Sequence, residues 1–568
     1  MASIEIKQGM KRFLKTGALL SMALLAVLLA ACSNGTTGST TPSSKSNVLT
    51  VGVSPKGPFS ENFNPFLSNG STNLYGTQGL LYEPLYFWDQ LNANSTQPLL
   101  AKSYDLSTDG LHVTFHLQTG VKWSDGQPFT SADVAFTINY SIQYASQGID
   151  PNGLAGFVKD VTTPDANTVT VDFKAPSSTN LWYLAGQTYI VPQHIWSTIT
   201  DPSKETVNNP VGTGPYVLDS FSAQDYKFKK NPTYWGGAPK VDEISFPAFD
   251  SNTSAATFLA TSGLDWTGLF IADIKDVYVN RDPAHNSYWF PGVQTTMLLL
   301  NLSEPKFQDV KVREAISTAI DRGQLNTVAE DGYQTIASPT GLTPGFLKDF
   351  LDPSYPSVFG AADPTSASSI LSGDGYTKDS NGYFAKGGQE LSFSVMAPNG
   401  WSDWNSMETL LQTQLKAAGI KVSVLEPSST DWSTKVADGN FDATLHWTNH
   451  GPNPYYMYNA LLASSNSAAI GSAANSNYQR WNDKTTDSLL STIANTTDPN
   501  VQKQAFDSLE GIMVNQVPAI PLVEGSDWNE FSTARFTGWP SATNPYALPA
   551  PFDEPDLEIT VLHLTPVA

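Results

Sequence analysis

The chain has few residues in the patterns that catalysis requires. Its 568 residues contain no His-Glu-x-x-His zinc motif, no Gly-x-Ser-x-Gly nucleophile turn and no Walker loop. Ser303 and Lys306 have the Ser-x-x-Lys spacing, but Pro305 and the helical pattern that follows indicate a connector. Paired carboxylates for glycoside cleavage stay open, since the sequence spacing of 53 acidic residues does not give their spacing in space. The sequence favours a binding protein over an enzyme.

The histidines are poorly placed to hold a metal. His446 and His450 are four residues apart, but the glycine and prolines that follow do not fit a helix, so the two rings need not converge. His112 and His116 alternate with apolar residues such as Val113, which predicts that both histidines lie on the solvent-exposed face of a strand. With no cysteine available as a ligand, we expect neither a metal nor a cofactor.

The single cysteine, Cys32, directly follows a secretory signal. Four basic residues precede an apolar segment at 17–31, which ends in Leu-Ala-Ala before Cys32. This order of basic, apolar and small residues is typical of a signal peptide rather than of a membrane-spanning helix. Leu-Ala-Ala-Cys also resembles the bacterial lipobox, whose cysteine is diacylated after cleavage. We therefore expect an extracytoplasmic protein that is anchored to the bacterial membrane by lipid on Cys32.

Charge and composition narrow the class of partner. The polar residues 33–47 form a flexible tether, and the lone cysteine excludes an internal disulfide. The leader has a net charge of +3, so the formal −22 of the whole chain leaves −25 for the mature part. Such an acidic surface argues against nucleic acid and anionic lipid as partners. We expect a monomer.

Strand and helix patterns alternate along the chain. An apolar run at 297–302 is too short for a membrane span and predicts a buried strand. A helix follows, with Asp309 as its N-cap and Arg322-Gly323 at its end. A second helix face at 407–418 ends at Gly419 before a strand at 420–425, and residues 48–53 predict another strand. This order indicates an α/β fold.

Three segments resemble one family. Residues 297–302 with 307–322, and more specifically residues 121–134, are similar to the family 5 solute-binding proteins, the oligopeptide and dipeptide receptors of ABC importers. The tail at 536–546 resembles the branch that binds cello- and xylo-oligosaccharides. The resemblance implies a bilobal periplasmic-binding-protein-like fold of type II, cluster C, with two lobes joined by a hinge and an extra subdomain on the N-terminal lobe. The implied domains are a signal peptide (1–31), the lipidated cysteine and linker (32–47), first-lobe core (48–73 and 207–298), extra subdomain (74–206), second lobe (299–523) and a return to the first lobe (524–568).

The ligand is predicted from the segment at 445–458. The family resemblance implies a motif of the type Trp-x-x-Asp-Tyr-x-Asp-Pro at this place in peptide-binding members. It also implies that the first aspartate of this motif pairs with the ammonium group of the bound peptide. Alignment on Trp447 and on Asn453-Pro454 assigns that position to Asn449, which has no charge. A buried ammonium without a counter-ion costs several kcal/mol, whereas an amide both donates and accepts hydrogen bonds and suits a hydroxyl-rich ligand.

Tryptophans support the same prediction. Six lie in expected loops or strand ends of the second half: Trp401, Trp404, Trp432, Trp447, Trp481 and Trp528. Flat indoles with a polar N–H are suitable platforms for sugar rings. We predict a neutral oligosaccharide as the ligand; an oligopeptide is the alternative, and a secreted glycoside hydrolase a distant one. ABC permease subunits are the expected partners. The candidate ligand-binding residues are Trp447, Asn449, Trp401, Trp404, Trp266, Tyr75 and Trp528.

Overall fold

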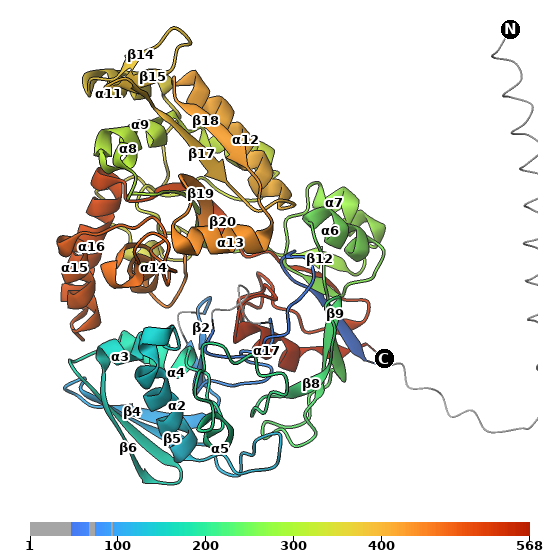
Figure 1. Ribbon diagram of the computed structural model, residues 1–568. Coiled ribbons are helices and arrows are strands. Elements are labelled where there is room, and N and C mark those ends of the chain that lie inside the picture. Colours follow the sequence, from blue (N-terminus) through green and yellow to red (C-terminus); the bar gives the residue numbers. More distant parts are fainter. Residues whose placement is uncertain (1–46, 68–73, 93–94, 568) are drawn as a thin grey trace, which may run out of the picture. The chain divides into compact units, whose positions relative to one another are not determined.

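Two large β-sheets with α-helices beside them form the framework of the folded chain (Figure 1). The computed structural model describes residues 47–67, 74–92 and 95–567. The signal peptide and Cys32 therefore lie outside the described residues. The α/β class expected from the sequence is confirmed by this arrangement.

The first sheet is built around β1 (Val48–Gly52), the strand expected at 48–53. β1 pairs in parallel with β10 on one side and with β11 on the other. Leu49 and Val51 are fully buried in the core of this sheet. In spatial order its seven strands are β12 (Asn286–Tyr288), β21 (Glu530–Ser532), β11 (Trp266–Thr267), β1, β10 (Glu243–Pro247), β9 (Asp225–Lys230) and β8 (Tyr216–Phe221).

The second sheet contains the strand predicted from the apolar run. That strand is β13 (Gly292–Leu300), and its four residues from Met297 to Leu300 are buried, as befits a strand with neighbours on both sides. It begins earlier than predicted and ends two residues sooner, where Asn301 donates its side-chain amide to the carbonyls of Gly439 and Phe441. The order of the five strands is β18 (Lys421–Leu425), β17 (Ser392–Met396), β19 (Ala443–Trp447), β13 and β20 (Ile520–Ser526).

The helix after β13 starts where predicted and ends early. In α9 (Val310–Ala319), the Asp309 carboxylate accepts a hydrogen bond from the backbone N–H of Lys311, as an N-cap does. The predicted end at Arg322-Gly323 was wrong, because Ile320 adopts an extended conformation and Asp321 caps a separate turn. The predicted helix at 407–418 is confirmed as α12 (Ser402–Ala417).

The chain passes between the two sheets at two adjacent places. Residues 289–291 join β12 to β13, and residues 527–529 join β20 to β21. The two connections run side by side: the N–H of Trp289 donates to the carbonyl of Asn529, and the N–H of Asp527 donates to the carbonyl of Pro291. We call residues 289–291 and 527–529 the double crossing. The domain bounds expected from the sequence stay a prediction.

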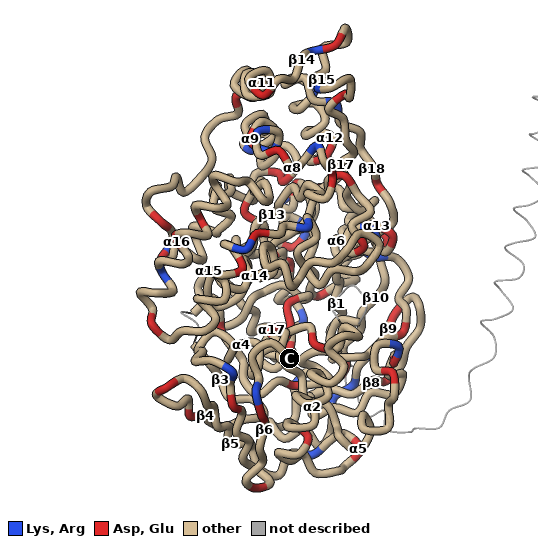
Figure 2. The backbone as a smooth tube through the Cα atoms, turned by 60° about the vertical axis from the view of Figure 1, so that its left-hand side comes forward, with Lys and Arg blue, Asp and Glu red and all other residues tan. Residues whose placement is uncertain are grey.

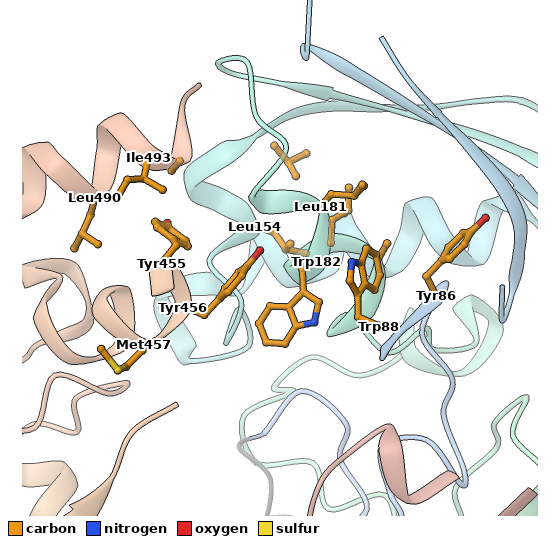
Figure 3. Packing of buried hydrophobic residues seen from close by; sticks show 14 of the residues in the cluster. Tyr86, Trp88, Leu154, Leu181, Trp182, Tyr455, Tyr456, Met457, Leu490 and Ile493 are labelled. Atoms are coloured by element: carbon orange, nitrogen blue, oxygen red, sulfur yellow. The ribbon is translucent and has the colours of Figure 1, made fainter. Parts of the chain in front are cut away.

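A four-stranded sheet forms a further layer beside the first sheet, and its inner face belongs to a core that continues into the second lobe. Trp182 on α4 (Asn180–Gly186) lies 4.4 Å from Tyr456 on α14 (Pro454–Leu462), ring centroid to ring centroid (Figure 3). The outer face carries His112 and His116, as predicted. Its strands, in order, are β4 (Ala101–Leu106), β5 (His112–Leu117), β7 (Thr168–Phe173) and β6 (Val158–Asp165).

Helices fill the spaces around these sheets. Within residues 47–67, 74–92 and 95–567, no helix is long and apolar enough to cross a membrane. Those that bear on the site or on the core are α2 (Ser131–Gln143), α6 (Asn252–Ala260), α13 (Ser429–Asp438), α15 (Lys484–Ala494), α16 (Pro499–Gln516) and α17 (Asp556–His563).

Arg313 ties α9 to the strand that leads back to the double crossing. This buried guanidinium donates to the backbone carbonyls of Phe307 and Gln308 and to those of Gln516 and Val517, directly before β20. We expect Arg313→Met to lower the free energy of unfolding by roughly 3 kcal/mol, because several buried carbonyls lose their donor. Urea unfolding followed by circular dichroism measures this, with Lys311→Met on the exposed side of α9 as the control. Equal stabilities of the two variants would contradict the role of Arg313.

Candidate ligand-binding site

Loops that follow strands of the two sheets meet at the candidate site. The indole N–H of Trp401, after β17, donates to the carbonyl of Pro55, after β1, over 3.0 Å. The N–H of Asn252, after β10, donates to the carbonyl of Gly400 over 3.1 Å. Ligands of open α/β sheets bind beyond the carboxyl ends of strands, and these loops occupy that position in both sheets.

Four tryptophans gather on the second-lobe side of this meeting point. We call Trp401, Trp404, Trp432 and Trp447 the indole cluster; all six pairs of ring centroids lie 5.1–6.2 Å apart. Trp404 and Trp432 are buried, whereas Trp447 is 38% exposed. Trp447 is therefore the most exposed indole of the cluster, with Trp401 half-buried beside it and two buried indoles as support.

The cluster combines residues from different kinds of element. Trp447 ends β19, and Trp401 directly precedes α12, in agreement with the expected strand ends and loops. The same expectation was wrong for Trp404 and Trp432, which lie within α12 and α13. The helical positions matter, because they direct these two indoles towards the sheet and bury them beneath Trp447.

His446 supports the cluster as a neutral ring. Its imidazole lies 4.4 Å from the Trp447 ring and 5.5 Å from that of Trp432, both in stacked orientation. Burial lowers the pKa of His446 to about 4, although its Nδ1 lies 2.8 Å from the carbonyl oxygen of Trp447. At neutral pH this position therefore adds an uncharged aromatic ring to the platform.

The remaining candidates from the sequence are dispersed. Trp266 is fully buried in the first sheet and donates its N–H to Asn529 and to the carbonyl of Pro549, so it presents no face to a ligand in this structure. Tyr75 is buried in the same core. Trp528 is half-buried at the double crossing, with its ring 4.8 Å from that of Phe290. None of the three lies in the indole cluster.

The alignment that assigned the peptide-binding aspartate to Asn449 needs correction by one residue. In the family motif the aspartate is the third residue after the tryptophan, and the third residue after Trp447 is His450. Asn449 is exposed in the loop after β19. At the corrected position the charge of the aspartate is still missing, and an imidazole takes its place.

His450 touches the first lobe. Its Nδ1 lies 3.1 Å from Oε1 of Gln90, and its Nε2 lies 3.5 Å from Oδ1 of Asp553. Gln90 follows β2 (Tyr86–Asp89), and Asp553 precedes α17. Counting residues in the motif could have identified His450, but no local pattern indicates either of its two partners.

Behind Asp553 lies a group of buried acids. Burial raises the pKa of Asp527 well above its ordinary value, and the nearby charge of Asp553 raises it further. Burial likewise raises the pKa values of Glu554 and Asp556, and Asp553 adds to both effects. At neutral pH these three carboxyl groups therefore hold protons more readily than ordinary acids do.

Over the described part of the chain, no group of three or more His, Cys, Asp or Glu side chains is arranged to hold a metal ion. A groove of about 550 Å³ adjoins the indole cluster at Gly400 and Ser402, on either side of Trp401. It is lined by uncharged side chains, including Ser251 from the first lobe and Asn405 from the second.

Comparison with known proteins places the chain among extracellular receptors. Residues 95–469 match the family described as bacterial extracellular solute-binding proteins, family 5 middle. Heme-binding protein A of Haemophilus influenzae is 27% identical over 90% of this chain and 94% of its own length. The glutathione-binding protein GsiB of Escherichia coli is 27% identical over 75% of this chain and 80% of its own length.

Solved structures share the fold. A mannohexaose-bound periplasmic oligopeptide-binding protein from Thermotoga maritima has a TM-score of 0.84 at 24% identity and covers 92% of this chain and 99% of its own. The oligopeptide-binding protein AppA of Bacillus subtilis, in complex with a nonapeptide, has a TM-score of 0.76 at 20% identity, with the same coverage. The periplasmic-binding-protein-like fold expected from the sequence is thereby confirmed.

The neutral state of His446 has a measurable consequence for stability. Its pKa of about 4 lies below the 6.5 or so of an unfolded histidine, so the unfolded state binds more protons between these values and stability falls as the pH falls. We expect this to account for roughly 2 kcal/mol between pH 7 and pH 5, and His446→Gln to lose correspondingly less stability over that range. Chemical unfolding at the two pH values tests this. An imidazole NMR signal from His446 that titrates near pH 6.5 would contradict it.

Proposed function

Since the chain belongs to the family 5 bacterial extracellular solute-binding proteins, we propose that it captures a neutral oligosaccharide, of the cello- or xylo- type, for an ABC importer. The resemblance to this family that the sequence predicted is confirmed. The named relatives are binding proteins rather than enzymes. ATP hydrolysis and translocation are the work of other subunits, to which this chain delivers its ligand.

The observation that carries the proposal is the indole cluster. A sugar ring has apolar C–H faces and a rim of hydroxyl groups, and an exposed indole fits such a face while leaving the rim to polar groups. Trp447 offers that surface, and three further indoles with His446 hold it in place. Asn449 in the next loop and the uncharged groove beside Trp401 supply amides and hydroxyls, which both donate and accept.

Charge at position 450 also favours a neutral ligand. The motif that the resemblance implies for peptide-binding members has an aspartate at this position, whereas this chain has His450. An imidazole gives no negative counter-charge to an ammonium group. The Thermotoga maritima neighbour is named as an oligopeptide-binding protein, yet it was solved with mannohexaose. Its name and its ligand differ, so we base our proposal on the side chains of this chain.

A peptide remains the second candidate because of Asp553. Its carboxylate lies at the contact between the lobes and is 9% exposed, and its ion-pair partner among the residues that the structure describes is the His450 imidazole. A peptide ammonium that displaced His450 would gain a carboxylate there. Several Brucella relatives are named putative peptide-binding proteins, and they are 30% identical over 57% of this chain.

Ligand capture would work by hinge closure about the double crossing. Within the described part of the chain, two short connections join the lobes, and their relative motion would be bending and twisting at residues 289–291 and 527–529. Contacts such as Trp401 to Pro55 form only when the lobes approach. A ligand that touches both lobes therefore stabilises the closed arrangement by its differential affinity for it.

We also propose that Cys32 is lipidated and anchors the protein to the outer side of the cell membrane. The support is the sequence Leu-Ala-Ala-Cys after a basic and apolar leader. Two acyl chains on one cysteine suffice for stable anchoring, and residues 33–47 give the folded part freedom to reach a permease.

The proposed function makes three predictions, and the first concerns the class of ligand. In a thermal-shift screen of cellopentaose, xylobiose, a tripeptide and the N-acetylated tripeptide, we expect stabilisation by an oligosaccharide and none by the peptides. A micromolar ligand at a hundredfold excess over its Kd adds about 2.7 kcal/mol of stability. Stabilisation by the free tripeptide alone would favour the second candidate. Labelled cello-oligosaccharide that is bound but not shortened distinguishes a receptor from a glycoside hydrolase.

The second prediction concerns the exposed indole. Trp447→Ala should weaken oligosaccharide binding at least about tenfold, or roughly 1.4 kcal/mol, since the stacking surface is lost. Phe258→Ala is the matched control, because Phe258 is 41% exposed on α6 and lies outside the indole cluster. Isothermal titration calorimetry compares the two. Unchanged affinity in Trp447→Ala would remove the main support for the proposal.

The third prediction concerns the anchor. The wild-type protein should sediment with membranes and carry a diacylglyceryl group on Cys32 by mass spectrometry, whereas Cys32→Ser should be released in soluble form. A wild-type protein found free in the medium, cleaved and unmodified at Cys32, would contradict lipidation.

A further inference from the structure

A row of contacts between the lobes runs from His450 to α14. At one end of this row the imidazole of His450 meets Gln90, which follows β2, with Nδ1 3.1 Å from Oε1. At the other end the ring of Tyr456 on α14 meets the ring of Trp182 on α4, with 4.4 Å between the ring centroids. His450 and Tyr456 belong to one short segment of the second lobe, whereas Gln90 and Trp182 belong to the first lobe.

Close packing links these two contacts within each lobe. On the second-lobe side Gly451 is buried against the ring of Tyr456, where an added Cβ would lie 2.5 Å from a ring carbon. On the first-lobe side Gly186 lies between Trp88 of β2 and Trp182, where an added Cβ would lie 2.8 Å from Trp88 and 3.2 Å from Trp182. Only glycine allows such close approach. The row is therefore closely packed within each lobe.

The contact at α14 is held by polar groups as well as by rings. The Tyr456 hydroxyl donates a buried hydrogen bond to the carbonyl of Thr179 over 2.6 Å. The side-chain amide of Gln502 on α16 donates to the hydroxyl of Thr179 over 3.3 Å. Trp88, Trp182 and Tyr456 are buried, and Figure 3 shows their rings in one row. We call these three residues the aromatic wall.

Trp447 lies between this row and another contact of the two lobes. Its ring centroid is 6.2 Å from that of Trp401, whose indole N–H donates to the carbonyl of Pro55 in the first lobe. Trp447 also directly precedes the loop that contains His450. The most exposed indole of the cluster is therefore flanked by a contact between the lobes at Trp401 and by the row that leads to the aromatic wall.

A linear oligomer on Trp447 has limited room between the lobes. If it extends along the loop after β19, its end meets the aromatic wall, where the ring contact and the hydrogen bond of Tyr456 would have to break. The buried carbonyl of Thr179 would then lose a donor, a cost that a shorter ligand does not incur. We propose that the aromatic wall limits the length of the bound oligomer, so that the receptor selects short chains that end before Trp182 and Tyr456. This limit rests on the proposed function as a receptor for a linear ligand and names the length class of that ligand.

A limit on length differs from a general contribution to closure. If the aromatic wall only helped to hold the lobes together, its removal would weaken the binding of every ligand by the same factor. If the wall limits length, its removal should favour long ligands relative to short ones. The ratio of the affinities for a long and a short ligand therefore measures the limit, because the contribution to closure cancels in this ratio.

The test is isothermal titration calorimetry of the mature chain with cellobiose, cellotriose, cellotetraose and cellohexaose. In wild type we expect cellohexaose to bind at least about tenfold more weakly than the tightest of the shorter sugars, because the long chain must part the wall. In Trp182→Ala this ratio should fall to about threefold or less. Tyr456→Ala opens the wall from the second lobe and should change the ratio in the same direction.

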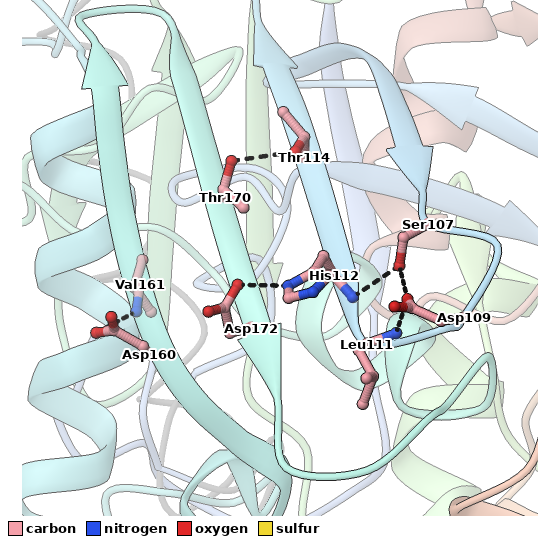
Figure 4. Close-up of polar contacts among 9 residues, drawn as sticks. All are labelled: Ser107, Asp109, Leu111, His112, Thr114, Asp160, Val161, Thr170 and Asp172. Carbon is pink, nitrogen blue, oxygen red and sulfur yellow. Dashed lines mark hydrogen bonds and ion pairs between the residues drawn. The ribbon is translucent and has the colours of Figure 1, made fainter.

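The matched control is His112→Ala. It also removes a ring from the first lobe, but His112 lies on the outer face of the four-stranded sheet, where its Nδ1 lies 2.7 Å from Oδ1 of Asp172 (Figure 4). This variant should keep the wild-type ratio. Circular dichroism and urea unfolding show whether the two wall variants fold, and the wild-type ratio tests the limit even where one of them does not.

The outcomes separate this inference from the proposed function. Equal or tighter binding of cellohexaose by the wild type would overturn the length limit while the receptor for a neutral sugar stands. A wild-type ratio that both folded wall variants keep would overturn it as well. If no oligosaccharide binds, the proposed function fails, and the same ratio measured with dialanine and hexaalanine decides on the wall. Binding of neither series would overturn both proposals.

Discussion

The double crossing is the constraint on which the other relations in this structure depend. Paired strands continue on both sides of it, β12 with β21 in the first sheet and β13 with β20 in the second. The two connections also bond to each other, so they move together as a short ribbon. Loops that are hundreds of residues apart in sequence, such as those of Pro55 and Trp401, can therefore meet repeatedly in the same geometry.

This constraint explains why so much of the second lobe serves to hold β13 and β20 in place. Arg313 and Arg322 are both buried, and neither is paired with a carboxylate at salt-bridge distance among the described residues. Their guanidinium groups donate instead to backbone carbonyls around β20, and that of Arg322 also lies 3.4 Å from the ring of Phe359. Such donors fix the backbone direction, because a planar fork satisfies several carbonyls in one geometry. The geometry of the double crossing therefore depends on how firmly β13 and β20 are held beside it.

Local sequence patterns predicted the helices and strands well, but they did not predict which of these elements contact each other in the fold. The apolar run of β13, the N-cap Asp309 and the face of α12 were read correctly, because each depends on neighbouring residues. Trp266 and Trp447 looked alike in sequence, yet one is fully buried and the other 38% exposed, since burial depends on what packs against an element. The partners of His450 come from residues near 90 and 553, and no periodicity connects these segments.

The negative charge of the chain bears on which ligands can bind. Acidic residues are spread over both lobes (Figure 2), and a formal charge of −22 opposes the approach of anionic ligands. Overall charge does not separate neutral ligands from cationic ones, so that choice must be made locally. At the contact between the lobes a protein imidazole already stands opposite the carboxylate that a ligand ammonium would need. A ligand ammonium that used Asp553 would displace this ring, whereas the proposed neutral ligand on Trp447 would leave it in place, so this contact would contribute to the proposed specificity.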